Sequence, residues 1–153
     1  MSEYPIWWDS TITLFNKFTD PETKIVKWYR TTINNCFWKY VNNRNSLGRY
    51  AVASDVFDVK SVICRIPKDE RYIDIVEWIN SKDKDRSEHF TLNTGDFIIL
   101  GEVDDVIDEY TKGRRATDIL AKYKLYNKSC EIETFTVDTG RGRCCEHYNI
   151  VGS

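Results

Sequence analysis

Cys145 and His147, near the end of the chain, have the residue types of a catalytic nucleophile and its base. They are two positions apart, so on a strand their side chains would face the same way. A Cys–His pair in that arrangement can support a thiolate nucleophile. Two residues at this spacing arise easily by chance, however, and neither histidine of the chain lies in a known nucleophile motif. We therefore expect both residues to be structural, with no catalytic residues and no enzymatic activity.

The cysteines also raise the question of a metal site. Cys130, Cys144, Cys145 and His147 have the ligand types that zinc prefers. Adjacent residues such as Cys144 and Cys145 rarely ligate one tetrahedral ion, and the Cys-x₂₋₄-Cys spacing of a zinc knuckle is missing. The five cysteines of the chain also lack the repeated spacing of a disulfide framework. We expect no metal and no cofactor, and reduced thiols that are mostly buried.

An acidic run follows the most apolar segment of the chain. A divalent cation could in principle bind there, but the run lacks the twelve-residue calcium-loop pattern with its Gly and terminal Glu. We expect a solvated acidic end of a strand instead. The residues of this run are Glu102, Asp104, Asp105, Asp108 and Glu109.

Two basic loops, Lys112–Arg115 and Arg141–Arg143, place arginines beside glycine. Such arginines can contact phosphate backbones without reading sequence. Neither loop is a phosphate loop, because no GxxxxGK[ST] motif is present. Solvated turn residues, or ion-pair partners of the acidic run, are the default interpretation of each loop. Both loops adjoin the end of a predicted β element, so they could converge on one face of the subunit. In a ring of several copies, the positive charges of these loops would add up to a substantial electrostatic field in the lumen.

The composition predicts one β-rich domain. The chain has 153 residues and a mass of 18.1 kDa, which suits a single domain with a real core. Its net charge of −2 is too small to indicate a dedicated polyanion binder. Aromatic residues make up 14% and favour strands and interfaces. With no run of roughly 20 apolar residues and no visible signal peptide, we expect a protein made and kept in a cytoplasm.

The segment 90–106 contains the predicted central strand. Thr94-Gly95-Asp96 is a turn signal, because Gly accepts backbone angles that other residues avoid and Asp bonds its own backbone. Phe97–Leu100 is an unbroken apolar run, typical of a strand buried on both faces. Asp104 and Asp105 end the segment. A helix is not expected, because Gly95 and Gly101 bracket the run too closely.

The segments before this strand also predict mainly β structure. Asn34-Asn35 indicates a break between two strands, and a bulge is expected near Asp58, where the alternation of apolar residues loses register. The polar stretch 42–50 is predicted to be an exposed loop. We expect an extended or irregular segment at 72–79 and a solvated charged loop at 81–88. The predicted strands are 11–18, 24–33, 36–41 and 52–66.

The segments after the central strand predict one helix and a hairpin. Ile119, Leu120 and Tyr123 lie on one side at helical spacing, so 116–123 is a short helix that caps one end of the sheet. The closing hairpin pairs 130–137 with 145–151. The fold class is therefore mainly β: a small β-barrel or sandwich-like antiparallel sheet with one short helix and long loops. We expect one domain over 1–153, with an N-terminal aromatic arm at 1–9.

Three stretches of the chain carry a family resemblance. The first is WWDSTITLFNKFTDPETKIVKWYRTTINNCFWKYV, the second FTLNTGDFIILGEVDDVIDEYTKGRRATDILAKYK and the third TGRGRCCEHYNIVG. They resemble the small neck proteins of tailed phages and prophages of Gram-positive bacteria. Such proteins commonly begin with an ITLYN-like strand, a turn, a strand ending in W-x-R-T and an aromatic CFW-like strand, which correspond here to Ile12–Asn16, Trp28–Thr31 and Cys36–Trp38. The segment 42–88 does not match.

The resemblance implies a head-closure or stopper protein of the head–tail connector. Members of that class are β-barrel-like subunits that assemble as a ring, usually a hexamer, below the portal and adaptor and above the tail terminator. The ring retains packaged double-stranded DNA without sequence specificity and docks the tail, and it needs no cofactor. The protein would then be made in the host bacterial cytoplasm and reside in the virion. The purified chain would be monomeric or weakly associated, and would form its ring on the connector.

The resemblance also implies candidate contact residues. Contacts within the ring or with neighbours are expected at Trp7, Trp8, Trp28 and Trp38, although core packing explains Trp28 and Trp38 equally well, since Trp favours both places. Candidate channel loops are 42–49, 81–88 and the Arg114-Arg115 loop. The candidate channel-facing or DNA-facing residues are Arg44, Arg49, Arg114, Arg115, Arg141 and Arg143.

Three alternative functions remain. A tail terminator or tail-completion protein also forms a ring, but normally on an α/β layout with more helix than predicted here. A single-stranded nucleic-acid-binding β-barrel would stack bases on aromatic residues along a basic groove, and this chain has a negative net charge and no basic–aromatic stripe. An enzyme using Cys145 is the third alternative, which an unchanged activity of Cys145→Ser would dismiss.

Overall fold

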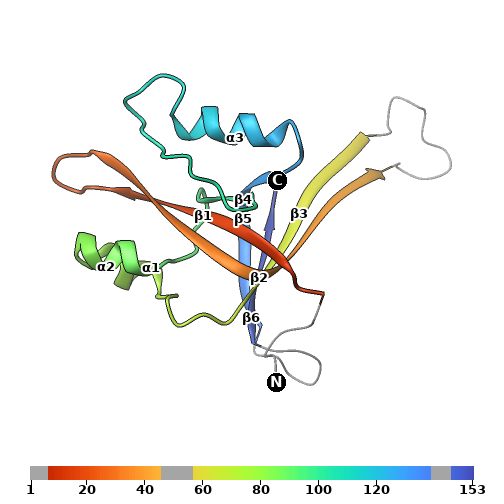
Figure 1. Ribbon diagram of the computed structural model, residues 1–153, viewed down its shortest axis with the longest axis horizontal. Helices are drawn as coiled ribbons and strands as arrows, with labels where there is room; N and C mark the ends of the chain where they lie inside the picture. The colour runs from red at the N-terminus through yellow and green to blue at the C-terminus, as the bar shows by residue number, and fades with distance from the viewer. Residues whose placement is uncertain (1–6, 46–56, 139–145) are drawn as a thin grey trace.

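The computed structural model describes residues 7–45, 57–138 and 146–153. The described strands form a closed antiparallel barrel in the order β1-β2-β3-β6-β5-β4 (Figure 1), which confirms the predicted mainly β fold. The strands are β1 (Ser10–Thr19), β2 (Val26–Asn45), β3 (Phe57–Pro67), β4 (Phe97–Leu100), β5 (Ser129–Asp138) and β6 (His147–Gly152). The described helices are α1 (Ile75–Ile79), α2 (Asp83–Glu88) and α3 (Ala116–Lys124).

The strand β2 is one continuous element of 20 residues, so the predicted break at Asn34-Asn35 is wrong. Its first part pairs with β1 as far as Cys36, and its second part pairs with β3 from Phe37 onward. Asn35 lies between the two parts with a φ of 59°, a left-handed conformation that Asn adopts more readily than most residues. The two asparagines therefore mark the point where the strand changes partner, not its end.

The strand β4 is buried on both faces, as its four consecutive apolar residues predict. Ile98 faces the main core inside the barrel. Phe97 and Ile99 face a second cluster outside it, where they pack with Phe15 of β1 and Ile119 of α3. The predicted helix is therefore confirmed, and it covers the outer face of the sheet at this strand.

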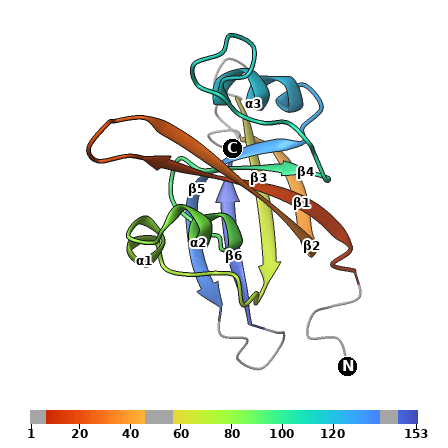
Figure 2. The same cartoon turned by 60° about the vertical axis from the view of Figure 1, so that its left-hand side comes forward.

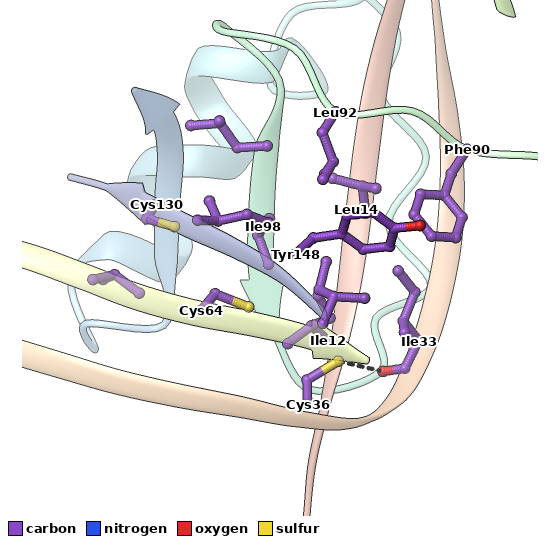
Figure 3. Packing of buried hydrophobic residues seen from close by; sticks show 14 residues of the cluster. Ile12, Leu14, Ile33, Cys36, Cys64, Phe90, Leu92, Ile98, Cys130 and Tyr148 are labelled. Carbon is purple, nitrogen blue, oxygen red and sulfur yellow. Dashed lines mark hydrogen bonds between the residues drawn. The ribbon is translucent and has the colours of Figure 1, made fainter. Parts of the chain in front are cut away.

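The main core contains buried residues from all six strands and from the segment before β4 (Figure 3). Cys36, Cys64 and Cys130 are free thiols inside it, in agreement with the expected reduced and buried cysteines. Burial raises the pKa of Cys36 and of Cys130 to about 12, so these thiols stay protonated and unreactive. Cys144 and Cys145 lie outside the described residues.

The hairpin of β1 and β2 projects from the barrel between two layers (Figure 2). One of its faces is covered by α1 and α2, where Trp78 contacts the rings of Phe18 and Tyr29. On the other face, Trp28 contacts Phe97 of β4 at 5.1 Å between ring centroids and donates to Glu109 of the segment that leads to α3. The hairpin is thus held rigidly although its end lies beyond the closed barrel.

The segments 72–79 and 81–88 contain helices, which corrects the prediction of an irregular segment and a charged loop. In α1, Asp74 caps the first turn, because its Oδ2 accepts from the Val76 amide at 3.1 Å. In α2, Asp83 accepts hydrogen bonds from the Tyr29 hydroxyl and from Lys27 Nζ, both at 2.6 Å. A five-residue helix is too short for its periodicity to be visible in the sequence, and contacts with β2 stabilise α2.

The pairing of β3 corrects a further expectation. Its register with β2 runs without a shift from Asn45 opposite Phe57 to Phe37 opposite Arg65, so the bulge predicted near Asp58 is absent from the described pairing. The irregularities lie elsewhere, between Ser10 and Ile12 and between Ile132 and Thr134. The predicted loop at 42–50 is wrong for 42–45, which are strand residues paired with 57–60. The predicted closing hairpin is confirmed as β5 and β6.

Gly152 closes the barrel, because it is paired with Val62 of β3 on one side and with Ile132 of β5 on the other. A Cβ at this position would overlap the carbonyl oxygen of Glu131 and lie 3.2 Å from Cys130 Sγ. We expect Gly152→Ala to lower the free energy of unfolding by about 2 kcal/mol through overpacking, measured by urea denaturation. The neighbouring Ser153→Ala should stay within about 0.5 kcal/mol. Equal stability of the two variants would contradict the close approach of Gly152 to the Glu131 carbonyl.

Candidate functional site

The acidic run organises the loop between β4 and α3. Glu109 Oε1 accepts from Trp28 Nε1 at 2.9 Å and from the Ala116 amide at 3.0 Å. One carboxylate therefore joins the projecting hairpin to the first turn of α3, where the helix dipole favours a negative charge. The prediction of a merely solvated acidic strand end thus misses a structural role of this residue.

Two further acidic residues of this loop, Asp105 and Asp108, also have partners. Asp108 accepts from the Tyr110 amide and from the Thr111 hydroxyl, at 2.9 and 2.7 Å, and these bonds lower its pKa, the hydroxyl bond most strongly. Asp105 accepts from the Tyr123 hydroxyl and pairs with Lys122 at 3.5 Å. Asp105 and Glu109 therefore hold the loop against α3, and Asp108 fixes the turn within the loop.

A buried polar network lies at the other end of β4. Asp96 is 3% exposed; its Oδ1 accepts from the Lys17 amide at 3.0 Å and its Oδ2 from Asn16 Nδ2 at 2.8 Å. The same Asn16 amide donates to the Thr91 carbonyl at 2.7 Å. Burial raises the pKa of Asp96 to about 6, even though the hydrogen bonds oppose the rise. The network ties β1 to the turn that precedes β4.

Two of the predicted interface tryptophans lie in the N-terminal arm and differ from one another. Trp8 is 3% exposed and contacts the His147 ring at 5.2 Å and the Phe37 ring at 6.5 Å. Its own chain therefore buries it and leaves little of its surface for the intermolecular contact that was predicted. Trp7 is 66% exposed and remains available for a partner. Residues 1–6 of the arm lie outside the described residues.

Trp28 and Trp38 are both half-buried. Trp28 packs against the second cluster and Trp38 against the main core. Core packing, the alternative for both residues, therefore accounts for most of their surface. Their remaining exposed surface is the part that a neighbouring subunit could contact.

Only part of the predicted set of arginines lies among the described residues. Arg114 and Arg115 are exposed on the loop before α3. Arg141 and Arg143 lie outside the described residues. Of the remaining candidates, Arg44 is opposite Asp58 in the pairing of β2 and β3, and Arg49 lies outside the described residues.

The described residues include only part of the candidate catalytic and zinc-binding sets, Cys130 and His147. His147 is buried beside Trp8, and its proposed partner Cys145 lies outside the described residues. No group of three or more Cys, His, Asp or Glu side chains within 7–45, 57–138 and 146–153 is arranged to hold a metal ion. Across the same residues, no helix is both long and apolar enough to cross a membrane.

Several large apolar side chains that were not among the predicted site residues are exposed. Ile25 at the end of the hairpin is 54% exposed and Tyr110 is 65% exposed. Leu125 and Tyr126, directly after α3, are 82% and 72% exposed. Leu125 and Tyr126 follow the last residue of the predicted helix, so they lie outside its apolar face and nothing in the helical pattern requires them to be buried. Exposed apolar residues gathered in this way are typical of contact surfaces.

Comparison with known proteins identifies a family but no function. Residues 7–153 match the family described as Family of unknown function (DUF6751), so the chain belongs to this family. No curated protein matches the chain. No solved structure matches it either.

Proposed function

We propose that this chain is a neck protein of a tailed phage, a head-closure (stopper) subunit. Copies of it form a ring, with a hexamer as the expected size, between the portal–adaptor and the tail. The ring retains packaged double-stranded DNA and docks the tail, and the subunit acts in the virion as a structural protein, not an enzyme.

One observation carries this proposal: the separate stretches that resemble neck proteins build a single packed unit. The first stretch forms β1 and most of β2, and the second forms β4 and α3. β1 of the first stretch pairs with β4 of the second, from Ile12 opposite Leu100 to Phe15 opposite Phe97. Trp28 of the first stretch also donates a hydrogen bond to Glu109 of the second. The third stretch contains β6, which closes the barrel between β3 and β5. The three stretches that carry the resemblance therefore pack together in one barrel.

The shape of the subunit also suits a ring. The projecting hairpin and the exposed side chains at its end lie outside the chain's own core, and so do Leu125 and Tyr126. Members of an assembly need such surfaces, because the closed barrel leaves few strand edges for pairing. The modest net charge of −2 fits a channel lining that contacts DNA weakly and without reading its sequence.

Deletion of the gene from the phage or prophage that carries it tests the proposal. We expect heads that package DNA but lose it, together with unattached tails, in electron micrographs of the lysate. The wild-type gene supplied in trans should restore complete particles. As a control, Val76→Ala, at a position of α1 that is 62% exposed, should restore them fully, whereas Gly152→Ala should restore them poorly because it lowers stability. Normal infectious particles from the deletion strain would refute the neck assignment.

A further inference from the structure

The end of the β1–β2 hairpin is a preorganised protrusion. Asp20 Oδ1 accepts from the amides of Glu22 and Thr23, at 2.8 and 3.3 Å. The Asp20 amide donates to the Ile25 carbonyl and the Lys24 amide donates to the Asp20 carbonyl, both at 2.9 Å. Every bond of this turn is local, so the turn holds its shape without a partner. A protrusion of this kind loses little conformational freedom when it binds.

Apolar side chains are exposed on this protrusion. Ile25 is 54% exposed, and Tyr110, from the distant loop before α3, is 65% exposed beside it. The Tyr110 hydroxyl accepts from the Val26 amide at 3.0 Å, which fixes the tyrosine against the hairpin. We call residues 20–25 together with Tyr110 the hairpin tip.

A small concave surface lies between the C-terminal end of α3 and the paired strands β2 and β3. Figure 1 shows the end of the β1–β2 hairpin and the C-terminal end of α3 on opposite sides of the molecule. The hollow has a volume of about 190 Å³, with room for one large side chain. Leu125 and Tyr126 follow α3 directly and are among the most exposed apolar side chains of the described residues. We call this hollow with Leu125 and Tyr126 the notch. The hollow is lined by Tyr40, Ser61, Val62, Lys124, Asn127, Ser129 and Ser153.

The charges of the two surfaces are opposite. The tip has Asp20 and Glu22, and with Lys24 included residues 20–25 have a net charge of −1. The notch includes Lys124 in the last turn of α3 and is next to Lys128, while Glu133 accepts from the hydroxyl of the lining residue Ser153. Two lysines and one glutamate leave the notch with a net positive charge. Surfaces of opposite sign attract during encounter and fix the orientation of docking.

We propose that the hairpin tip of one copy docks in the notch of a second copy. The apolar side chain of Ile25 enters the hollow, Tyr110 packs against Tyr126, and Glu22 lies near Lys124. A second copy is the partner that the observations favour, because one chain carries both complementary surfaces on opposite sides. Such a contact joins unlike surfaces and is therefore head-to-tail, the type that generates rings when the rotation closes. The inference deepens the proposed function and rests on it for its biological setting.

Photo-cross-linking of the purified full chain tests the contact. Benzoylphenylalanine in place of Tyr126 should cross-link to residues 20–27 or to the segment around Tyr110 of another copy, as identified by mass spectrometry. The same probe at Val137, which is 58% exposed on β5, serves as the control and should not label the tip. Cross-links that avoid the tip, or a chain that stays uncross-linked at the highest soluble concentration, would overturn the contact.

A charge exchange supplies a second readout that does not depend on the probe. Glu22→Lys and Lys124→Glu should each weaken self-association about threefold in sedimentation equilibrium, and the double variant should recover the wild-type value. Ile25→Asp should weaken it at least tenfold, a loss that the exchange of charges does not repair. Failure of the double variant to recover would refute the pairing.

The two proposals fail separately. A cross-link between tip and notch in a chain whose deletion leaves virions intact would support the contact and refute the neck assignment. Loss of packaged DNA from the heads of the deletion strain, together with cross-links only outside the hairpin tip, would support the neck assignment and refute the contact.

Discussion

Trp78→Ala is expected to lower the free energy of unfolding by about 3–5 kcal/mol, the range for truncating a fully buried tryptophan. Trp78 is 0% exposed and is the buried residue of α1. Its ring contacts those of Tyr29 at 5.3 Å and Phe18 at 6.1 Å, and its Nε1 donates to the Arg86 carbonyl at 3.3 Å. The substitution therefore removes the side chain that holds both α1 and α2 against the hairpin.

The measurement is urea denaturation followed by far-UV circular dichroism. Val76→Ala is the matched control, because Val76 lies in the same helix but is 62% exposed; it should change stability by less than about 0.5 kcal/mol. Hydrogen exchange should show faster exchange in 74–89 for Trp78→Ala alone. A loss below about 1 kcal/mol would mean that α1 and α2 contribute little to the folded state.

The second large effect is a dependence of stability on pH through Asp96. Its pKa is about 6 in the folded chain and 3.8 for an ordinary aspartate. The folded state therefore binds this proton more tightly than the unfolded state does. The resulting stabilisation is fully present below about pH 4 and is lost as the pH rises from 4 to 6. A rise of this size corresponds to about 3 kcal/mol.

Comparison with Asp96→Asn isolates this contribution, because the amide does not titrate. The stability of the wild type minus that of the variant should fall by about 3 kcal/mol between pH 4 and pH 7. Asp83→Asn is the control, because hydrogen bonds from Lys27 and Tyr29 lower the pKa of Asp83. The stability of the wild type minus that of Asp83→Asn should therefore be constant above about pH 4 and should fall as the pH drops below it. A difference for Asp96→Asn that does not vary with pH would contradict the buried carboxylate.

Local patterns predicted the elements whose signals lie within a few residues. The apolar run of β4 and the helical stripe of α3 were both visible in the sequence. Asp74 is the N-cap of α1, but this helix was not predicted, because five residues are too few to show helical periodicity. Asn34-Asn35 was read as a break, because nothing local distinguishes the end of a strand from a change of partner within it.

The tertiary fold determined the remaining features. Trp8 is buried because the closing of the barrel brings His147 and Phe37 beneath it. Asp96 was correctly placed in a turn, yet its burial depends on Asn16, which is 80 residues earlier. The role of Glu109 likewise depends on Trp28, 81 residues away. Contacts at such separations leave no periodic signal in the sequence.

Cryo-electron microscopy of the neck in complete virions that encode this chain tests the central claim most directly. The account predicts a ring of copies between the portal–adaptor and the tail, each fitting the closed barrel with its projecting hairpin. The account would be contradicted if other proteins explained all the density of the neck and the virions lacked this chain.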